Sequence, residues 1–259
     1  AKKFSAERVM RLPESVFIQS VTGEYIDDWL DDRTVNPADR DMETRPDLTT
    51  LRVVPWGEEP TACVIHDCFE PDGSPVDIAP REVLRRIVAL YQGLGLVPVV
   101  APEIEFYLVK RNTDPDYPLE PPIGRSGRKE TVRQPYSMDA VDEFEPFIED
   151  IYDYCETQRL DVDNLAHESG TAQLELNFQH GDPISLCDQM FLFKRTVRET
   201  AMRHEIYATF MAKPMEHEPG SAMHWHMSLR RAADGSNAFS LPDGAESELF
   251  HWFIGGLQR

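Results

Sequence analysis

The sequence predicts an α+β or α/β protein in which a larger mixed domain follows a smaller β-rich domain. Three observations support this. Short runs rich in Val, Ile, Thr and Phe fill the first 78 residues, and helix-like and strand-like segments alternate after them. In addition, 41% hydrophobic residues in a chain of 259 are enough for a sizeable core. We therefore expect domains at 1–78 and 79–259.

Three strand-like runs define the N-terminal part. They are SVFIQSVTG at 15–23, TTLRVVPW at 49–56 and TACVIHDCFE at 61–70. Between the first two, DDRTVNPADRDMETRPD at 31–47 has the Asp, Asn and Pro content that is typical of a loop. The expected structure is a small β domain with one long connection.

A helix is expected at PREVLRRIVALYQGLG, residues 80–95. Pro80 suits the first helical position, and Gly93 can close the end. A dinucleotide-binding loop would instead place its glycines after a strand and before a helix. The expected buried stripe consists of Leu84, Ile87, Val88 and Tyr91.

Two further helices are expected, at about 139–159 and 183–207. Their apolar residues recur at spacings of three and four, and Asp182 can cap the second helix, with Pro183 in its first turn. A last apolar helix face is formed by Leu249, Phe250, Phe253 and Ile254. Strand candidates lie at about 98–109, 171–179, 207–213 and 221–230.

The charge and the cysteines exclude several classes of protein. With 46 acidic and 26 basic residues, the formal charge of −20 would repel a nucleic-acid backbone or an anionic membrane. The four cysteines lack paired spacing, which favours free thiols in a reducing compartment. The sequence also shows no long apolar span and no signal-peptide pattern, so we expect a soluble cytoplasmic protein.

Three strand candidates carry polar residues at alternating positions, which places these residues on one face of each strand. Glu103 and Glu105 would lie roughly 7 Å apart and repel each other by about 2 kcal/mol at an effective dielectric constant of 20. That repulsion favours a bound cation. The second polar face consists of Gln173, Glu175 and Asn177, and Glu168 lies just upstream of it. The third consists of His224, His226 and Ser228. On the opposite side of that third strand is an apolar row that we expect in the core, formed by Met223, Trp225, Met227 and Leu229.

Each motif taken alone is compatible with more than one kind of structure. Glu-x-Glu is commonly a solvated strand face, and His-x-His fits an exposed edge strand, core histidines or a cupin-like iron site. Their co-occurrence favours a shared polar cavity. Carboxylates with one or two imidazoles favour Mg²⁺ or Mn²⁺ over zinc, and two or more such ions suit phosphoryl transfer.

Four segments in order resemble motifs of the glutamine synthetase superfamily. They are PEIEFYL, HESGTAQLELN, ATFMAKP and GSAMHWHMSL, and DRDMETRPD extends the resemblance toward the N-terminus. The resemblance implies an N-terminal β-grasp domain, a catalytic half-barrel of strands, and stacked rings that form a dodecamer. It also implies ATP-dependent formation of an amide from the γ-carboxylate of glutamate, through a γ-glutamyl phosphate intermediate.

The resemblance also assigns roles to residues. Two or three Mg²⁺ or Mn²⁺ ions would bind in each site, together with ATP as co-substrate. Gly220 would lie against glutamate, and Asp41, in a loop of a neighbouring subunit's small domain, would shape the amine site with Tyr136. His226 and Ser228 would contact the nucleotide. The implied metal ligands are Glu105, Glu168 and Glu175 for one ion, and Glu103 and His224 for the ion that bridges the phosphates.

Some features depart from the common family pattern. Pro219 stands where the family usually has Asn, and the interval from Glu168 to Glu175 is one residue shorter. The segments around these positions are closer to the γ-glutamylpolyamine synthetase branch, so an organic amine such as a polyamine is the expected acceptor. The alternatives are a glutamine synthetase that uses ammonia and a truncated non-catalytic relative, because family members continue well beyond Arg259.

Overall fold

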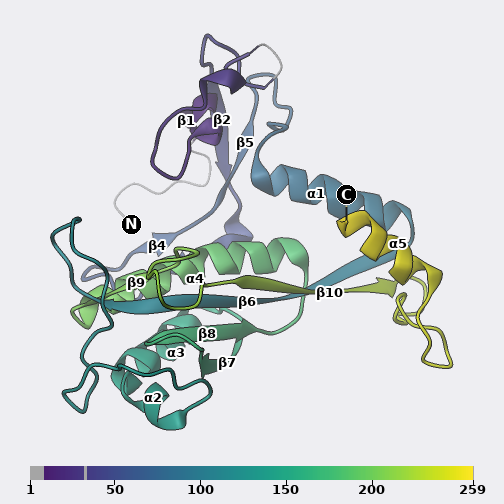
Figure 1. Cartoon of the computed structure of the whole chain (residues 1–259). Helices are drawn as coiled ribbons and strands as arrows, with labels where there is room; N and C mark the ends of the chain where they lie inside the picture. Colours follow the sequence, from purple (N-terminus) through teal and green to yellow (C-terminus); the bar gives the residue numbers. More distant parts are fainter. Residues whose placement is uncertain (1–8, 32–33, 259) are drawn as a thin grey trace. The chain divides into compact units, whose positions relative to one another are not determined.

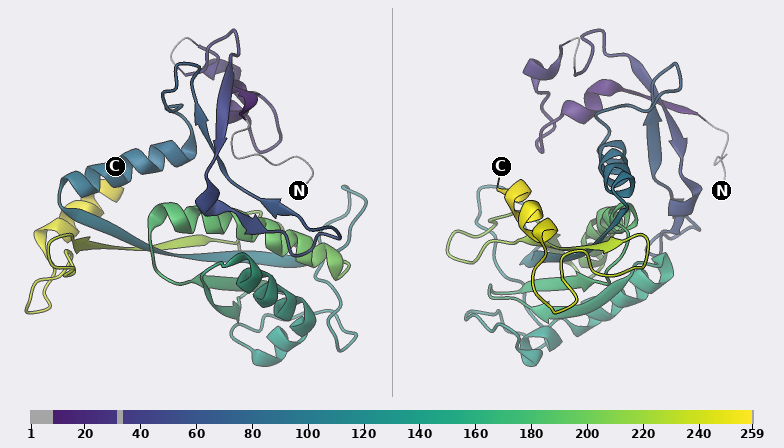
Figure 2. Two further views of the ribbon diagram at one scale, coloured as in Figure 1. Left: turned by 180° about the vertical axis from the view of Figure 1, so that it is seen from behind. Right: turned by 90° about the vertical axis from the view of Figure 1, so that its right-hand side faces the viewer.

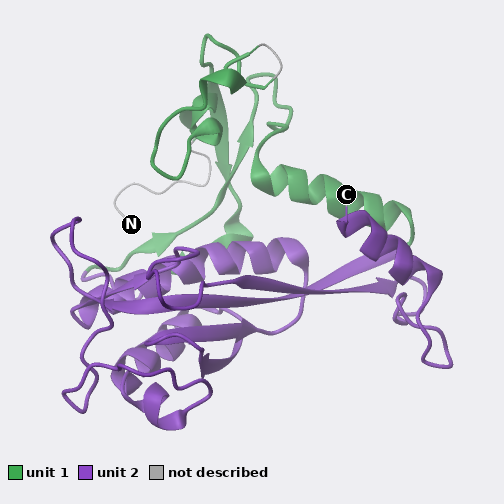
Figure 3. Ribbon diagram, viewed as in Figure 1, with its two compact units in different colours: residues 1–54, 59–95 green, residues 55–58, 96–259 purple. Residues whose placement is uncertain are grey.

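The computed structural model describes residues 9–31 and 34–258, which form two compact units (Figure 3). Unit 1 comprises residues 1–54 and 59–95, and unit 2 comprises residues 55–58 and 96–259. Both units combine helices with antiparallel strands, as expected for an α+β protein. The predicted boundary after residue 78 falls just before a helix that clusters with unit 1, and the domain assignment itself stays a prediction.

Unit 1 contains a three-stranded antiparallel sheet of β1 (Met10–Pro13), β2 (Asp41–Pro46) and β5 (His66–Phe69), in the order β1-β2-β5. A second, two-stranded sheet pairs β3 (Arg52–Val53) with β4 (Ala62–Cys63). Short 3₁₀ helices lie at η1 (Glu14–Ile18), η2 (Asp27–Trp29) and η3 (Leu48–Thr50).

Two expectations for unit 1 were wrong. The run 15–23 begins inside η1 because both the backbone N–H and the hydroxyl of Ser15 donate to the Asp39 carboxylate, at 3.0 and 2.9 Å. The expected loop 31–47 contains β2, in which Met42 and Thr44 are buried at alternating positions. The charged residues between them concealed this alternation.

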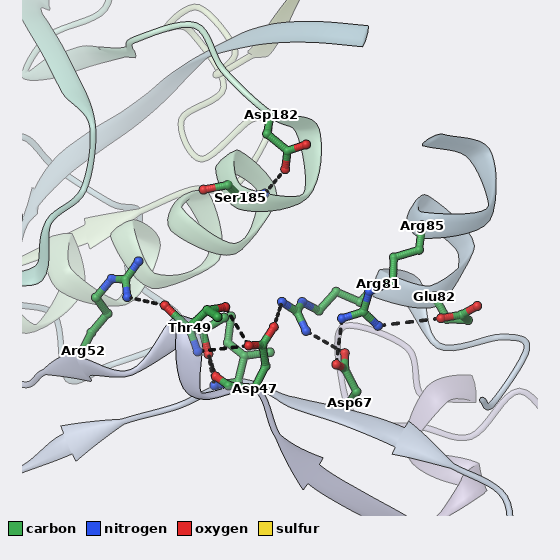
Figure 4. Close-up of polar contacts among 11 residues, drawn as sticks. Asp47, Thr49, Arg52, Asp67, Arg81, Glu82, Arg85, Asp182 and Ser185 are labelled. Atoms are coloured by element: carbon green, nitrogen blue, oxygen red, sulfur yellow. Dashed lines mark hydrogen bonds and ion pairs between the residues drawn. The ribbon is translucent and has the colours of Figure 1, made fainter. Parts of the chain in front are cut away.

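Helix α1 (Pro80–Gly93) begins and ends as predicted and is tied to the strands of unit 1 by charged side chains (Figure 4). Arg81 binds Asp47 at 2.7 Å and Asp67 at 2.6 Å, and Arg85 binds Asp67 at 2.7 Å. Burial alone would raise the pKa of Asp47, but hydrogen bonds from Thr49 and Arg81 outweigh it and lower that pKa. Polar contacts therefore hold this helix.

The expected apolar stripe of α1 is partly covered within the described residues, with Leu84 and Tyr91 half-buried. Val88 is buried, whereas Ile87 is 46% exposed and Leu90, outside the predicted stripe, is 66% exposed. The helix ends in Gly93, and Gly95 provides the left-handed turn that follows, with φ of +72°. Amphipathic spacing therefore predicted the helix correctly but not the burial of its whole face.

Unit 2 is built around the long strand β6 (Leu96–Lys110), as Figures 1 and 2 show. One edge of β6 pairs first with β10 (Met223–Arg231) and then with β9 (Ile206–Thr209). The other edge pairs with β8 (Gln173–Phe178), which pairs in turn with β7 (Val162–His167). All these pairs are antiparallel. Strand β7 was not predicted, because its sequence VDNLAH has little apolar alternation.

Four helices complete unit 2: α2 (Met138–Asp142), α3 (Glu145–Gln158), α4 (Pro183–Arg203) and α5 (Glu248–Leu257). Helix α4 packs against β6, β9 and α3. The predicted helix 139–159 is instead two helices, because Pro146 has no N–H to donate to the Asp142 carbonyl of a continuous helix and its ring would clash with that carbonyl. In α5, Phe250 and Phe253 contact the ring of Phe239.

The core of unit 2 lies between the sheet and α4. The ring of Phe193 meets Phe106 and Phe178 edge-on, at centroid distances of 6.5 and 5.3 Å. Inside the core, Gln158 donates to the hydroxyl of Thr196 at 2.8 Å and so joins α3 to α4. Because the apolar residues of β6 and β8 face α4, their alternate residues face the opposite side of the sheet.

Two further predictions concern the whole chain. All four cysteines are free thiols, as expected. In the described part of the chain, none of the helices has the length and apolar content needed to cross a membrane.

Removal of the helix cap at Asp182 should destabilise unit 2. The Asp182 carboxylate accepts from the Ser185 backbone N–H at 2.9 Å at the start of α4, as predicted. We expect Asp182→Ala to lower the free energy of unfolding by about 1 kcal/mol in urea denaturation. The control is Glu149→Ala, at an exposed position of α3. Equal stability of the two variants would contradict the capping role.

Candidate functional site

The pairing register of the central strands places the predicted polar residues on one face of the sheet. Glu105 lies opposite Glu175 in the neighbouring strand β8, and Glu103 lies opposite His224 in β10. Directly paired residues of antiparallel strands point to the same face. Asn177 also pairs with Glu103. Three strands that are distant in sequence therefore contribute to one polar surface.

Three of these residues are close enough to share one ion. Glu103, Glu175 and His224 each offer a ligand atom, and these atoms lie within 4.8 Å of one another. Nδ1 of His224 is 3.5 Å from Oε2 of Glu103, and Nε2 of His226 is 2.7 Å from Oε1 of the same carboxylate. Two carboxylates and an imidazole suit a hard divalent ion such as Mg²⁺ or Mn²⁺.

Glu105 is the most buried carboxylate of this face, with 8% of its surface exposed. Its Oε2 accepts from Nε2 of Gln173 at 2.9 Å and from the Ala222 backbone N–H at 3.1 Å. Both donors lie inside the motifs quoted above, Gln173 in HESGTAQLELN and Ala222 in GSAMHWHMSL. The position of Glu105 is therefore fixed by hydrogen bonds from β8 and from the segment that precedes β10.

Glu168 follows the end of β7, and its Oε2 accepts from the Ser169 backbone N–H at 2.9 Å. Burial raises the pKa of Glu175, and the negative charges of Glu103, Glu168 and Glu105 raise it further. We call Glu103, Glu105, Glu168 and Glu175 the carboxylate cluster. Its mutual repulsion would be relieved by a bound cation.

Gly220 lies beside this cluster, and a side chain there would be obstructed. A Cβ at this position would be 2.8 Å from the carbonyl oxygen of Ala212, which is backbone and cannot turn away. The carbonyl oxygen of Gly220 accepts from Nε2 of Gln173 at 3.1 Å. The preceding carbonyl, of Pro219, accepts from the hydroxyl of the buried Tyr107 at 2.7 Å.

Tyr136 is anchored near Glu168 through its backbone. Its N–H donates to the carbonyl oxygen of His167 at 2.9 Å, while its side chain is 78% exposed. Its φ of +60° lies in the left-handed region, and this backbone conformation costs a residue other than glycine roughly 1 kcal/mol of conformational free energy. The fold therefore holds the backbone of Tyr136 in a strained conformation beside His167, the residue before Glu168.

A cavity of about 580 Å³ extends along β6 and β10. His226 and Ser228 line it together with Arg230, His180 and Asn237. Pockets of this size accommodate typical small ligands. His226 and Ser228, to which the resemblance assigns contacts with the nucleotide, therefore line one shared cavity.

The expected burial of the apolar row of β10 was mostly wrong. Leu229 is buried, but Met223 and Met227 are 45% and 48% exposed. The reason is that β10 is an edge strand, whereas α4 packs against β6 and β9. The side chains of His224 and His226 are 60% and 66% exposed, as on an exposed edge strand, yet both lie against Glu103.

The location of Asp41 also differs from the expectation. It is not in a loop but is the exposed first residue of β2, opposite Pro13 of β1. The alternation of buried Met42 and Thr44 extends the strand back to this position. Asp41 belongs to unit 1 and is not among the residues that unit 2 brings together.

Sequence reasoning missed some residues that support the site. Gln173 was placed on the correct face, but no signal indicated that its amide would hold Glu105. Glu130, whose Oε2 accepts from the Ala172 backbone N–H at 2.7 Å, lies in the long connection before α2. That connection has no periodicity from which a buried carboxylate could be inferred.

Replacement of Glu175 should stabilise the metal-free protein at neutral pH. Because the folded state raises the pKa of this group, ionisation reduces stability as the pH rises above the ordinary value of 4.5. In EDTA at pH 7, Glu175→Gln should therefore increase the free energy of unfolding, by less than about 1 kcal/mol because the group is partly exposed. At pH 4 the gain should vanish.

Urea denaturation at both pH values checks this, with Glu149→Gln on the exposed side of α3 as the control. A loss of stability in Glu175→Gln at pH 7 would show that the carboxylates of the cluster do not repel one another.

Comparison with known proteins identifies the family. The family described as "Glutamine synthetase, catalytic domain" matches residues 77–259. Gamma-glutamylputrescine synthetase PuuA of Escherichia coli is 32% identical over 97% of this chain and 53% of its own length. Glutamate–isopropylamine ligase of a Pseudomonas species is 31% identical over 84% of this chain and 48% of its own length.

A solved structure is similar as well. The structure titled "Apo GmaS without ligand" superposes with a TM-score of 0.73 at 29% identity, over 88% of this chain and 51% of that chain. The chain thus spans about half the length of the curated relatives it matches. The family match covers most of the chain, including all the residues of the carboxylate cluster. The chain therefore belongs to the glutamine synthetase catalytic domain family.

Proposed function

We propose that this chain is part of an ATP-dependent ligase that joins the γ-carboxylate of glutamate to an amine through γ-glutamyl phosphate. The observation that carries the proposal is the convergence of Glu103, Glu105, Glu175 and His224 on one face of the sheet. Two anionic reactants, a carboxylate and a phosphate, can approach each other only if their charge is neutralised. In a chain with a formal charge of −20, divalent ions suit that purpose.

The carboxylate cluster and His224 would hold the ions, which are Mg²⁺ or Mn²⁺ in this proposal. Family members generally depend on ATP and a divalent metal. Glu105, Glu168 and Glu175 would bind the ion near the acceptor carboxylate, and Glu103 and His224 the ion near the ATP phosphates. When bound, such ions would withdraw charge from the transferred phosphoryl group. Gln173 keeps Glu105 oriented toward this task.

The cavity beside β10 would hold the nucleotide. His226 and Ser228 line it, and Arg230 adds a cation that suits phosphate. Gly220 would lie against glutamate, where a side chain is obstructed by the Ala212 carbonyl. Tyr136, held beside Glu168, would shape the amine site.

We assign Asp41 the role of a general base that removes a proton from the incoming ammonium group. It would act from the small domain of a neighbouring subunit, in a dodecamer of the kind that the family resemblance implies. A carboxylate suits the task because it attracts the cationic amine before accepting its proton. The three-stranded sheet of unit 1 is the part that we assign to a β-grasp domain.

An organic amine is the favoured acceptor, in a cytoplasmic enzyme. Two relatives are named for the amines putrescine and isopropylamine, which supports this choice. Relatives named glutamine synthetase, such as that of Pyrococcus horikoshii at 34% identity, favour ammonia as the second candidate. The two candidates, an organic amine and ammonia, are distinguished by which of them stimulates phosphate release from ATP.

The test is phosphate release from ATP by the complete protein with glutamate, Mg²⁺ and, in turn, ammonium, isopropylamine and putrescine. We expect the organic amines to stimulate release more than ammonium does. Glu175→Gln should lower kcat/KM at least about 100-fold, because a metal ligand is lost, while Glu149→Gln should leave it unchanged. Stimulation by ammonium alone would favour the second candidate, and no stimulation by any amine would refute the ligase.

A further inference from the structure

Glu130 is a buried carboxylate outside the carboxylate cluster. Its side chain is only 7% exposed. Oε2 accepts from the Ala172 backbone N–H at 2.7 Å and lies 3.1 Å from Nε2 of His167. Oε1 is buried and has no hydrogen-bond partner within residues 9–31 and 34–258. A buried and half-satisfied carboxylate is costly, so its two contacts point to a functional role.

The first contact connects Glu130 to Glu168 through an imidazole. His167 is fully buried, and its Nδ1 lies 2.7 Å from the carbonyl oxygen of Glu168. A carbonyl oxygen only accepts, so Nδ1 carries a hydrogen and donates it. Nε2 lies 3.1 Å from Oε2 of Glu130, and a hydrogen carried by either of these two atoms completes a hydrogen bond that fixes the orientation of the ring. The hydrogen bond from Nδ1 of His167 thereby fixes the backbone carbonyl of Glu168.

The second contact holds the other end of the same turn. Ala172 has a left-handed φ of +55°, which a residue other than glycine adopts only under external constraint. Its N–H is the donor to Glu130. The turn is closed by the N–H of Glu168, which donates to the carbonyl of Gln173 at 2.8 Å. Gln173 in turn donates to Glu105 at 2.9 Å.

Glu130 thus contacts both ends of the turn that carries one cluster residue and supports another. We propose that Glu130 is a positioning residue for the divalent-ion site, which holds Glu168 through His167 and Glu105 through Ala172 and Gln173. The inference rests on the proposed function, because it requires that the cluster bind ions. Partners of this kind behind metal ligands commonly alter metal affinity 10-fold to 100-fold when replaced.

The test is a titration of the purified complete protein with Mn²⁺ alone, in which free Mn²⁺ is followed by electron paramagnetic resonance. Glu130→Ala should weaken Mn²⁺ binding by about 10-fold or more. Glu130→Gln should weaken it less, because the amide oxygen can still accept from the Ala172 N–H. The matched control is Glu120→Ala, which removes a carboxylate of the same connection whose ion pair with Lys129, at 3.5 Å, lies at the surface. It should bind Mn²⁺ like the wild type.

Circular dichroism and thermal unfolding establish whether each variant is folded. A folded Glu130→Ala variant with wild-type Mn²⁺ affinity would overturn this inference but would leave the proposed function intact. Failure of both Glu130 variants to fold would also overturn it, because the residue would then support the whole unit rather than the turn. A wild-type protein that binds no Mn²⁺ would overturn the proposed function, and this inference with it.

Discussion

Repulsion between carboxylates is the constraint on which the rest of unit 2 depends. Glu103, Glu105 and Glu175 occupy adjacent positions on one face of an antiparallel sheet, and Glu168 adds a fourth negative charge that acts on Glu175. Such an arrangement lowers stability unless a cation is present. The opposite face of the same strands is apolar and packs against α4, and this burial offsets the cost.

Glu105 and Glu168 are oriented by neutral and backbone donors, whereas Glu103 lies against the imidazoles of His224 and His226. Gln173 and the Ala222 amide orient Glu105, and Ser169 orients Glu168. Donors of this kind fix the oxygens without cancelling their charge, which leaves the charge available for ions. The partly buried ion pairs of Arg81 lie elsewhere, in unit 1, where they fasten α1 to the strands. The two units thus use ionic groups for different purposes.

Much of unit 2 could be predicted because alternation and capping are local signals. The polar faces of β8 and β10 and the cap at Asp182 were visible as residue spacing. The exposure or burial of a residue could not be predicted where it depends on which other segments pack against it. The exposure of Met223 follows from the edge position of β10, and the burial of Glu130 follows from contacts with residues far along the chain. In unit 1, the cause was local, because the charged residues around Met42 and Thr44 concealed the alternation of β2.

The most direct test of the central claim is a crystal soaked with Mn²⁺ and examined by anomalous diffraction. The account predicts one anomalous peak within coordination distance of the Glu103 carboxylate and the His224 imidazole, and a second peak within coordination distance of the carboxylates of Glu105, Glu168 and Glu175. Anomalous peaks only at other surfaces of the protein, with these side chains turned away from one another, would contradict it.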